Sequence, residues 1–388
     1  MKKFLAFVMA ASMALSLAAC VGSTPASSTA STTTEATSEA AASTSGSKTD
    51  VAFVTDVGNI DDQSFNQYTW QGVQDFCSAN SLNANYYRPT EDSDAARLEQ
   101  MDNAVNDGAK SIVVAGYLFG SAIAEAQAKY PDVQFLALDV STADLGDKAP
   151  TSNTALITYK EEQAGYLAGY AAVTDGYKEL GFLGGMAVPA VIRYGYGFVQ
   201  GADAAAAELG QNIEINYFYG GQFYGDANIT SRMEGWYSNG TQVVFACGGG
   251  IYTSAVEAAL KNNGYVIGVD VDQNYIGANG VADGTYAYNP FITSAMKGLS
   301  EAVNTALADI EAGSWGDIAG SNGNFGLEDG DYIGLPTDAD SWNFESFTTD
   351  EYEEVKGKIK SGEITVDNSS DDATKPTVSE FTTVNYIQ

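Results

Sequence analysis

The segment Ser-Ile-Val-Val-Ala-Gly at residues 111–116 gives the most direct indication of the fold class. Its successive side chains are apolar or small, so both faces of the strand that it predicts are apolar. A strand with two apolar faces belongs to a sheet that helices cover on both sides. The segment therefore predicts a buried, mainly parallel sheet.

Short β-rich runs and helical patterns alternate along the rest of the chain. The expected strands cover residues 51–56, 111–116, 133–139, 180–184, 214–219, 242–247 and 265–270. The expected helices cover residues 64–78, 94–106, 122–129, 161–174, 192–209, 254–261 and 291–312. Repeated βα units predict an α/β fold, and their number exceeds what one ordinary domain holds. We therefore expect two doubly wound parallel sheets.

Several expected strands end in residues that suit a small ligand. They are Asp56, Gly116, Asp139, Gly185, Gly248 and Asp270. In doubly wound sheets, ligands bind beyond the carboxyl ends of the strands. A cleft between two lobes, lined by these strand ends, is the expected small-molecule site.

The charge balance excludes several classes of function. The chain has 388 residues, with 18 Lys and Arg, 50 Asp and Glu, and a formal net charge of −32. Nucleic-acid binding and electrostatic adsorption to anionic lipid both need clustered positive charge, so we expect neither. The chain has no histidine, which removes Ser-His-Asp triads, Cys-His pairs and imidazole zinc ligands. We expect no catalytic residue, no cofactor and no bound metal.

The first fifty residues have the layout of a lipoprotein leader followed by a tether. Two lysines precede an uncharged apolar run that ends in Leu-Ala-Ala-Cys at residues 17–20. This ending resembles the bacterial lipobox, in which the peptide is cut before the cysteine and its thiol is diacylated. We therefore expect a signal peptide at residues 1–19, a lipidated Cys20, and a disordered Ser/Thr/Ala-rich tether over residues 20–50. Such an anchor would hold the protein on the extracytoplasmic face of the cell membrane; the alternative is an ordinary secretory signal with an incidental cysteine.

Three further segments carry a family resemblance. They are Val-Thr-Asp-Val-Gly-Asn-Ile-Asp-Asp-Gln-Ser-Phe-Asn-Gln at 54–67, Leu-Gly-Phe-Leu-Gly-Gly-Met-Ala-Val-Pro at 180–189, and Val-Val-Phe-Ala-Cys-Gly-Gly-Gly at 243–250. In this order and spacing they resemble the BMP family, the purine-nucleoside-receptor-like lipoproteins that serve ABC transporters. The resemblance runs from about residue 51 to residue 366. The family name includes the word basic whereas this chain is acidic, a difference that concerns surface charge and leaves the motifs intact.

The resemblance implies a type I periplasmic-binding-protein fold, in which two doubly wound lobes enclose a ligand cleft. It implies an N-terminal lobe of residues 51–157 plus 289–315 and a C-terminal lobe of residues 158–288 plus 316–388. It also implies that a purine nucleoside closes the lobes and that the closed form docks on an ABC permease, which works with an ATPase subunit.

Two aromatic side chains are expected to form walls of the site. Phe65, at the start of the first helix, is one wall by resemblance, since aromatic faces stack on nucleobases; a core position is the alternative. Phe223, in Gly-Gly-Gln-Phe-Tyr-Gly-Asp at 220–226, best fits the wall from the other lobe. Tyr224 is the second choice there, and a packing role for Phe223 stays open.

Three aspartates are the expected polar contacts. Asp56 can accept hydrogen bonds from a purine N–H or amino group, Asp270 can accept from two ribose hydroxyls, and Asp139 is a further candidate. A helix cap or a solvated loop position is the alternative for Asp56. We expect Asp61, Asp62 and Ser64 to cap the first helix instead of contacting ligand.

Two glycines and one lysine complete the expected site. Gly248 and Gly249 precede a helix, where exposed backbone N–H groups can bind ligand oxygens. Lys297 is expected near the start of the helix at 291–312, and by resemblance it reaches the ribose or the base. A surface ion pair is the alternative for this lysine.

The leading hypothesis is therefore a substrate-binding lipoprotein of an ABC importer that captures a purine nucleoside and performs no chemistry. A second hypothesis keeps the fold and changes the ligand to a sugar or sugar-like signal molecule, for which Arg193 is a candidate cation. A third is an extracytoplasmic nucleoside hydrolase or glycosidase, although the commonest acid–base side chain is absent. A surface sensor without an importer is the fourth.

Overall fold

The computed structural model describes residues 48–388 and contains two β-sheets. The expected signal peptide, Cys20 and nearly all of the expected tether lie outside the described residues. The first sheet has the spatial order β11 (Asn322–Phe325), β5 (Thr154–Tyr159), β4 (Gln134–Leu138), β3 (Ser111–Ala115), β1 (Val51–Val54) and β2 (Ala84–Tyr87). All of its neighbouring strands pair in parallel.

The second sheet has seven strands. Their spatial order is β12 (Ile333–Gly334), β10 (Phe291–Lys297), β9 (Tyr265–Asp270), β8 (Val243–Cys247), β6 (Glu179–Gly184), β7 (Ile213–Tyr219) and β13 (Thr382–Ile387). Every pair is parallel except β10 with β12, which is antiparallel. All seven strands expected from the sequence are present in the two sheets, and the parallel pairing is confirmed.

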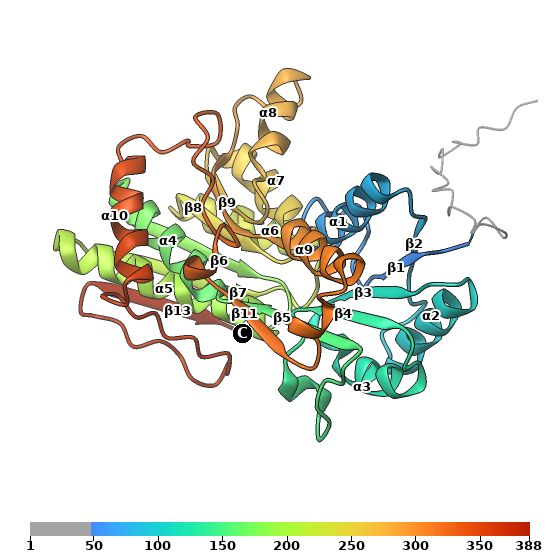
Figure 1. The fold of residues 1–388 in the computed structure, drawn as a ribbon. Helices are drawn as coiled ribbons and strands as arrows, with labels where there is room; N and C mark the ends of the chain where they lie inside the picture. Colours follow the sequence, from blue (N-terminus) through green and yellow to red (C-terminus); the bar gives the residue numbers. More distant parts are fainter. Residues whose placement is uncertain (1–47) are drawn as a thin grey trace, which may run out of the picture. The chain divides into compact units, whose positions relative to one another are not determined.

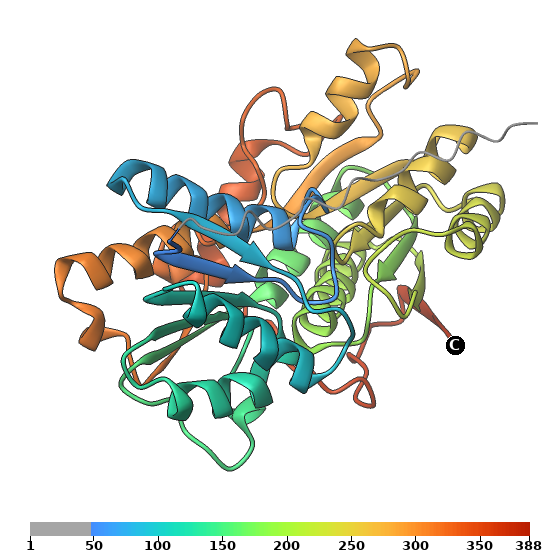
Figure 2. The ribbon, with the colours of Figure 1, turned by 90° about the vertical axis from the view of Figure 1, so that its right-hand side faces the viewer.

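Helices cover both faces of the first sheet. On one face lie α1 (Phe65–Asn80) and α9 (Leu299–Ala312), which Figure 2 shows side by side in blue and orange. On the other face lie α2 (Asp94–Asn106) and α3 (Gly120–Lys129). Strand β1 shows the cause: Phe53 packs into the core beneath α1, while Val54 packs into the core beneath α2 and α3. A strand with apolar side chains on both faces needs this double cover.

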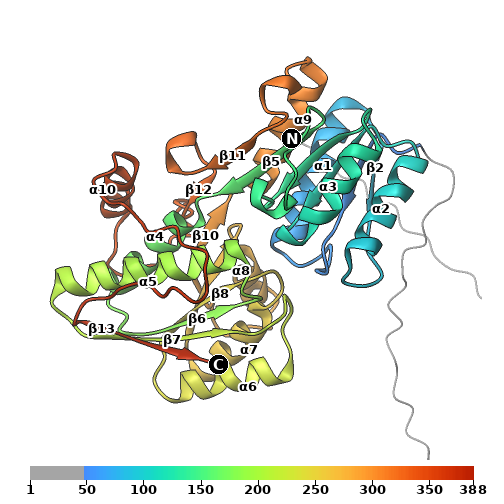
Figure 3. The ribbon, with the colours of Figure 1, turned by 90° about the horizontal axis from the view of Figure 1, so that it is seen from below.

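The second sheet is built in the same way. Helices α4 (Glu161–Thr174) and α5 (Pro189–Leu209) cover one face, and α6 (Ala227–Ser238) and α7 (Tyr252–Asn262) cover the other, as Figures 1 and 3 show. The remaining helices are α8 (Asn274–Ala282) and α10 (Thr349–Lys360). Four short 3-10 helices occur at Tyr117–Phe119, Thr142–Leu145, Trp315–Asp317 and Leu327–Asp329. The sequence patterns had indicated neither α6, α8 and α10 nor the strands β2, β5, β11, β12 and β13.

The chain passes between the two sheets at three places, which are β5 to α4, β10 to α9, and β11 to β12. Two strands lie on the other side of the lobe boundaries that the resemblance implied. Strand β10, in the range 289–315, pairs with β9 of the second sheet, and β11, in the range 316–388, pairs with β5 of the first sheet. The crossings after β10 and β11 therefore fall at about residues 298 and 326 instead of 289 and 316, and the division into two moving lobes stays a prediction.

The expected helix over residues 291–312 is wrong at its start. Residues Phe291–Lys297 form strand β10, and the helix begins at Leu299 after Gly298. The strand is buried along nearly its whole length between β9 and β12, an environment that favours its aromatic and β-branched residues in extended form. Lys297 consequently ends a central strand, and its side chain lies at the edge where the other strand ends meet.

Candidate functional site

One cavity brings together all eight residues that the sequence analysis selected for ligand binding. From the first sheet and α1 come Asp56, Phe65 and Asp139, and from the second sheet come Phe223, Gly248, Gly249, Asp270 and Lys297. The cavity has a volume of about 620 Å³, including the space at its open mouth. Its place at the carboxyl ends of parallel strands is the usual one for a ligand site in doubly wound sheets.

Phe65 and Phe223 line the cavity from opposite sheets. Phe65 is the first residue of α1, and Phe223 lies in the loop between β7 and α6; both side chains are partly buried. Tyr224, the second choice for this loop, is 57% exposed and is not among the residues that line the cavity. The two phenylalanines therefore present one aromatic ring from each sheet.

The side of the cavity next to α1 is formed by Asp56, Asp62 and Asn66, which we call the acidic wall. Asp62 caps α1 as expected, because its carboxylate accepts the backbone N–H groups of Ser64 (2.9 Å), Asn66 (3.0 Å) and Gln67 (3.1 Å). It also lines the cavity, which the sequence analysis had not expected.

Asp56 of the acidic wall is held in the same manner. Its Oδ1 atom accepts hydrogen bonds from the backbone N–H of Gly58 (2.6 Å) and from Nδ2 of Asn66 (3.0 Å). Burial raises the pKa of Asp56 above its usual range, and these two donors partly oppose the rise. The acidic wall is therefore a set of acceptors whose orientation the start of α1 fixes.

Another part of the cavity lining is backbone, at Gly248 and Gly249; together with Gly185, which packs against Gly248, we call these residues the glycine wall. Gly248 has a φ of +145°, and a Cβ atom there would lie 3.0 Å from the backbone of Gly185 and 3.2 Å from the Phe223 ring. A Cβ atom on Gly185 would lie 2.5 Å from the same ring. Only glycine fits these positions, so the glycine wall sets how closely Phe223 approaches the strand ends.

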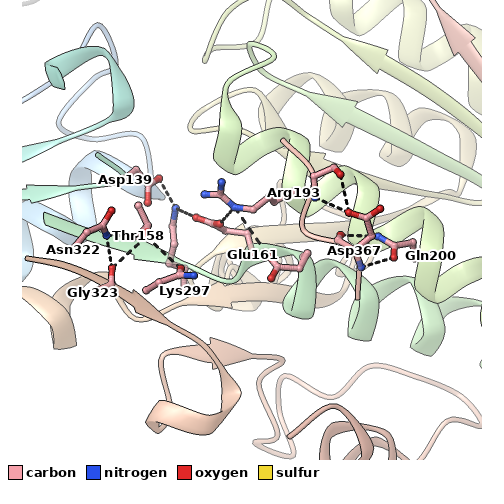
Figure 4. Close-up of polar contacts among 12 residues, drawn as sticks. Asp139, Thr158, Glu161, Arg193, Gln200, Lys297, Asn322, Gly323 and Asp367 are labelled. Carbon is pink, nitrogen blue, oxygen red and sulfur yellow. Dashed lines mark hydrogen bonds and ion pairs between the residues drawn. The ribbon is translucent and has the colours of Figure 1, made fainter. Parts of the chain in front are cut away.

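Lys297 lies among carboxylates from three elements. Its Nζ atom is 2.7 Å from Oδ2 of Asp139 and 3.5 Å from Oε1 of Glu161, as Figure 4 shows, and 3.9 Å from Oδ1 of Asp270. The same atom lies 4.8 Å from the centre of the Phe65 ring. Burial by itself would lower the pKa of Lys297, but the carboxylates outweigh it and raise the pKa. The lysine is therefore a buried ammonium group, not part of a surface ion pair.

Asp139 and Asp270 follow or end strands of different sheets and share this lysine. Both residues have positive φ angles, 57° and 67°, a left-handed conformation that aspartate tolerates better than most residues and that is frequent at functional sites. Burial raises the pKa of Asp139 to about 6 although Lys297 opposes the rise. Burial likewise raises the pKa of Asp270, against the lowering effects of Lys297 and of the Ser64 hydroxyl.

Direct hydrogen bonds connect the two sheets at one edge of the cavity. Ser64 Oγ, at the start of α1, donates to Oδ2 of Asp270 at 2.5 Å. The Nε2 atom of Gln273, from the segment after β9, donates to the carbonyl oxygen of Gln63 at 3.1 Å. These contacts hold the start of α1 against the end of β9, so the cavity has walls from both sheets in this structure.

Arg193 does not line the cavity. Its Nε atom donates to Oε2 of Glu161 at 2.6 Å, and Glu161 is fully buried at the start of α4. The guanidinium group therefore forms an ion pair behind the site. Arg193 is not placed to contact a ligand in the cavity, as the sugar hypothesis requires.

The cavity is also lined by residues that were not selected from the sequence, among them Asn66, Val188, Val191, Tyr194 and Cys247. Asn66 lies within the motif at 54–67 and could have been found there. The other four resemble ordinary core residues at helical or strand spacing, so the sequence carries no signal that separates them from the core.

Three polar atoms of cavity residues are buried without a hydrogen-bond partner in the described part of the chain. They are Oδ1 of Asn66, Oδ1 of Asp139 and the hydroxyl oxygen of Tyr194. A buried polar group without a partner costs about 1–3 kcal/mol, and a polar ligand is one means of supplying that partner. The site therefore suits a ligand that carries several hydrogen-bond donors.

Residues 48–388 contain no helix that combines the length and the apolar character needed to span a bilayer. The expected lipid anchor at Cys20 lies before the described residues, and it stays a prediction.

Comparison with known proteins identifies the family. The profile of the family described as "ABC transporter substrate-binding protein PnrA-like" matches residues 49–370. The chain is 31% identical over 329 residues to the "CD4+ T-cell-stimulating antigen" of Listeria innocua, covering 81% of this chain and 87% of that protein. It is 30% identical over 283 residues to the "ABC transporter nucleoside-binding protein BmpA" of Lactococcus lactis, covering 69% and 76%.

A solved structure agrees in fold. The solute-binding protein of an ABC transporter system from Aeropyrum pernix K1 superposes with a TM-score of 0.69 at 22% identity, covering 84% of this chain and 95% of that one. This likeness confirms the periplasmic-binding-protein fold. Together with the family profile, it leads to one conclusion: the chain belongs to the BMP family of PnrA-like ABC transporter substrate-binding proteins.

Proposed function

We propose that this substrate-binding protein captures a purine nucleoside in the cavity between its two sheets and delivers it to an ABC permease. The observation that carries the proposal is the pair of phenylalanines, Phe65 and Phe223, that line one cavity from opposite sheets. A purine has two faces, and aromatic stacking contributes about 1–3 kcal/mol per base.

The polar groups between the phenylalanines match the rest of a nucleoside. Asp56 and Asn66 offer a carboxylate and an amide to the edge of a base, and Asp270 and Lys297 offer an acceptor and a donor to ribose hydroxyls. The excess of acceptors favours an uncharged ligand that is rich in N–H and O–H groups. The name of the Lactococcus lactis relative, a nucleoside-binding protein, supports the same ligand class.

Delivery would follow from closure of the two lobes around the ligand. The hydrogen bond from Ser64 to Asp270 joins the two sheets at the cavity edge, and ligand in the cavity would favour this arrangement over one in which the sheets are apart. We propose that the closed form docks on the permease and that lipidated Cys20 and its tether keep the protein at the outer face of the membrane.

The first test is mass spectrometry of the small molecule that co-purifies with residues 48–388, released by denaturation. A purine nucleoside in a one-to-one ratio supports the proposal. A thermal-shift series with inosine, guanosine, adenosine, ribose and galactose is the second test, because a ligand that binds only the folded state raises its stability. Stabilisation by a sugar but by no nucleoside would assign the site to the sugar alternative.

A further inference from the structure

A group of three buried charges lies directly behind the ligand cavity. Glu161 and Glu162 begin α4, and Arg193 lies in the first turns of α5; none of the three lines the cavity. Figure 4 shows Glu161 between Lys297 on one side and Arg193 on the other. The cavity therefore has a second layer of charge that contacts no ligand.

Glu161 connects this second layer to the ligand-facing lysine. Its side chain is fully buried, with Oε2 at 2.6 Å from Nε of Arg193 and Oε1 at 3.5 Å from Nζ of Lys297. The Oε1 atom has no hydrogen-bond partner in the described part of the chain, so its interaction with Lys297 is the Coulombic attraction of an ammonium group. Arg193 fixes the other oxygen and thereby the direction in which Oε1 points.

The position of Lys297 depends on a balance among three carboxylates. Asp139 and Asp270 come from different sheets and both line the cavity, whereas Glu161 lies behind it. A lysine has a flexible stem of four carbons. Its ammonium group already donates to Oδ2 of Asp139, so without the attraction of Glu161 it would move toward Asp270, now 3.9 Å away. There it would occupy an acceptor that the ligand needs.

We propose that Glu161 is a positioning residue that holds the Lys297 ammonium group at the back of the ligand cavity, with Arg193 orienting the Glu161 carboxylate. The expected effect of Glu161 on nucleoside affinity rests on the proposed function. The expected effect of Glu161 on the position of Lys297 is independent of that function.

Glu162 provides a matched control. It follows Glu161 in sequence, begins the same helix and is also buried, and its Oε2 atom is 3.9 Å from Nε of Arg193. Among the described residues, only Arg193 forms an ion pair with it, and Lys297 does not. A Glu162→Gln variant thus replaces a buried carboxyl group at the same place without removing the attraction on Lys297.

The affinity test uses calorimetric titration of inosine into the wild type and into Glu161→Gln, Glu161→Asp and Glu162→Gln variants. We expect Glu161→Gln to lose about tenfold in affinity, the lower end of the loss seen when a partner that orients a metal-ligating residue is removed. We expect Glu162→Gln to stay within about twofold and Glu161→Asp, which keeps the charge, to recover part of the loss. Equal affinities for the wild type and Glu161→Gln, or equal losses in both glutamine variants, would overturn the proposal.

The second test needs no ligand. Crystal structures of the ligand-free wild type and the Glu161→Gln variant give the separation of Lys297 Nζ from Asp139 and Asp270. A lysine that moves into the cavity in the variant supports the proposal, and an unmoved lysine refutes it. If the wild type binds no nucleoside, the proposed function fails and these structures still decide the role of Glu161. Should Glu161→Gln fail to fold, Glu161→Asp is compared in its place.

Discussion

The acidic wall and the glycine wall belong to one cavity but are built by opposite means. The acidic wall consists of side chains, and the cap of α1 and neighbouring amides fix their direction. The glycine wall consists of backbone, and the absence of side chains at Gly185 and Gly248 lets Phe223 approach the strand ends. The comparison suggests that one side supplies hydrogen-bond chemistry and the other supplies shape.

The largest loss of ligand affinity is expected from the glycine wall. Gly248→Ala would impose the left-handed backbone on a residue with a Cβ atom, at about 1–3 kcal/mol of strain, and would push against Gly185 and Phe223. We expect no measurable inosine binding by calorimetry and a lower free energy of unfolding. Gly250→Ala is the control, because its Cβ atom would lie 3.5 Å from the nearest atom, an ordinary contact. If Gly248→Ala binds inosine with wild-type affinity, the absence of a side chain at the glycine wall is not required for ligand binding.

The next largest effect is expected from the two phenylalanines. Phe65→Ala and Phe223→Ala should each weaken inosine binding by about 1–3 kcal/mol, the usual worth of stacking on a base. Phe65→Ala should have the larger effect, because its ring also faces the Lys297 ammonium group at 4.8 Å. Tyr224→Ala, next to Phe223 and largely exposed, serves as the control and should bind as the wild type does. An unchanged inosine affinity in either alanine variant would show that the phenylalanine ring packs in the core and does not stack on the ligand.

The acidic wall should show a smaller effect on affinity that is coupled to stability. Asp62→Ala leaves three backbone N–H groups at the start of α1 without their acceptor, and loss of such a cap costs about 0.5–2 kcal/mol. We expect the free energy of unfolding in urea to fall by that amount and inosine affinity to fall less than in the phenylalanine variants. The neighbouring Asp61 is exposed, so Asp61→Ala should match the wild type. Equal behaviour of the two variants would refute the capping role.

The smallest effect on affinity is expected from Glu162, behind the cavity, where pH dependence of stability identifies the buried carboxyl groups. Burial raises the pKa of Glu162 from 4.5 to about 7 and that of Asp139 from 3.8 to about 6. Because the pKa of each group is higher in the folded chain than in the unfolded chain, the protonated form stabilises the folded state. This contribution to the free energy of unfolding is complete below about pH 4 and is lost as the pH rises through about 6 to 7. The negative charge of Glu161 adds to the rise in both pKa values. Lys297 opposes the rise for Asp139, and Arg193 and Lys160 oppose the rise for Glu162.

The measurement is the free energy of unfolding between pH 5 and pH 8, two values chosen on either side of about pH 6 to 7. Glu162→Gln should flatten the decline over this interval and leave inosine affinity within about twofold of the wild type. Glu363→Gln, at an exposed position, should keep the wild-type slope. A Glu162→Gln variant with the same slope as the wild type would show that this carboxyl group does not titrate in the interval.

The contrast between the walls also explains how much the sequence revealed. Every residue of the acidic wall lies within the contiguous motif at 54–67, where local capping chemistry leaves a recognisable pattern. The glycine wall joins segments more than sixty residues apart, after β6 and β8, and only the general rule that ligands bind at the carboxyl ends of parallel strands indicated, ahead of the resemblance, that they share a site. Residues such as Tyr194 and Cys247 could not be selected at all, because a cavity residue and a core residue obey the same hydrophobic pattern.

The sequence by itself determined the alternation of strands and helices, the parallel sheets, the family and the eight residues selected for the site. The first two are encoded in local periodicity and the family in short motifs, whereas Phe65, Phe223 and Lys297 entered the set of eight through the resemblance. Only the tertiary structure decided that 291–297 is a strand, that Arg193 pairs with Glu161, and that Lys297 lies among three buried carboxylates. The reason is physical: burial and the pairing of charges depend on segments that are distant in sequence and meet only when the sheets assemble.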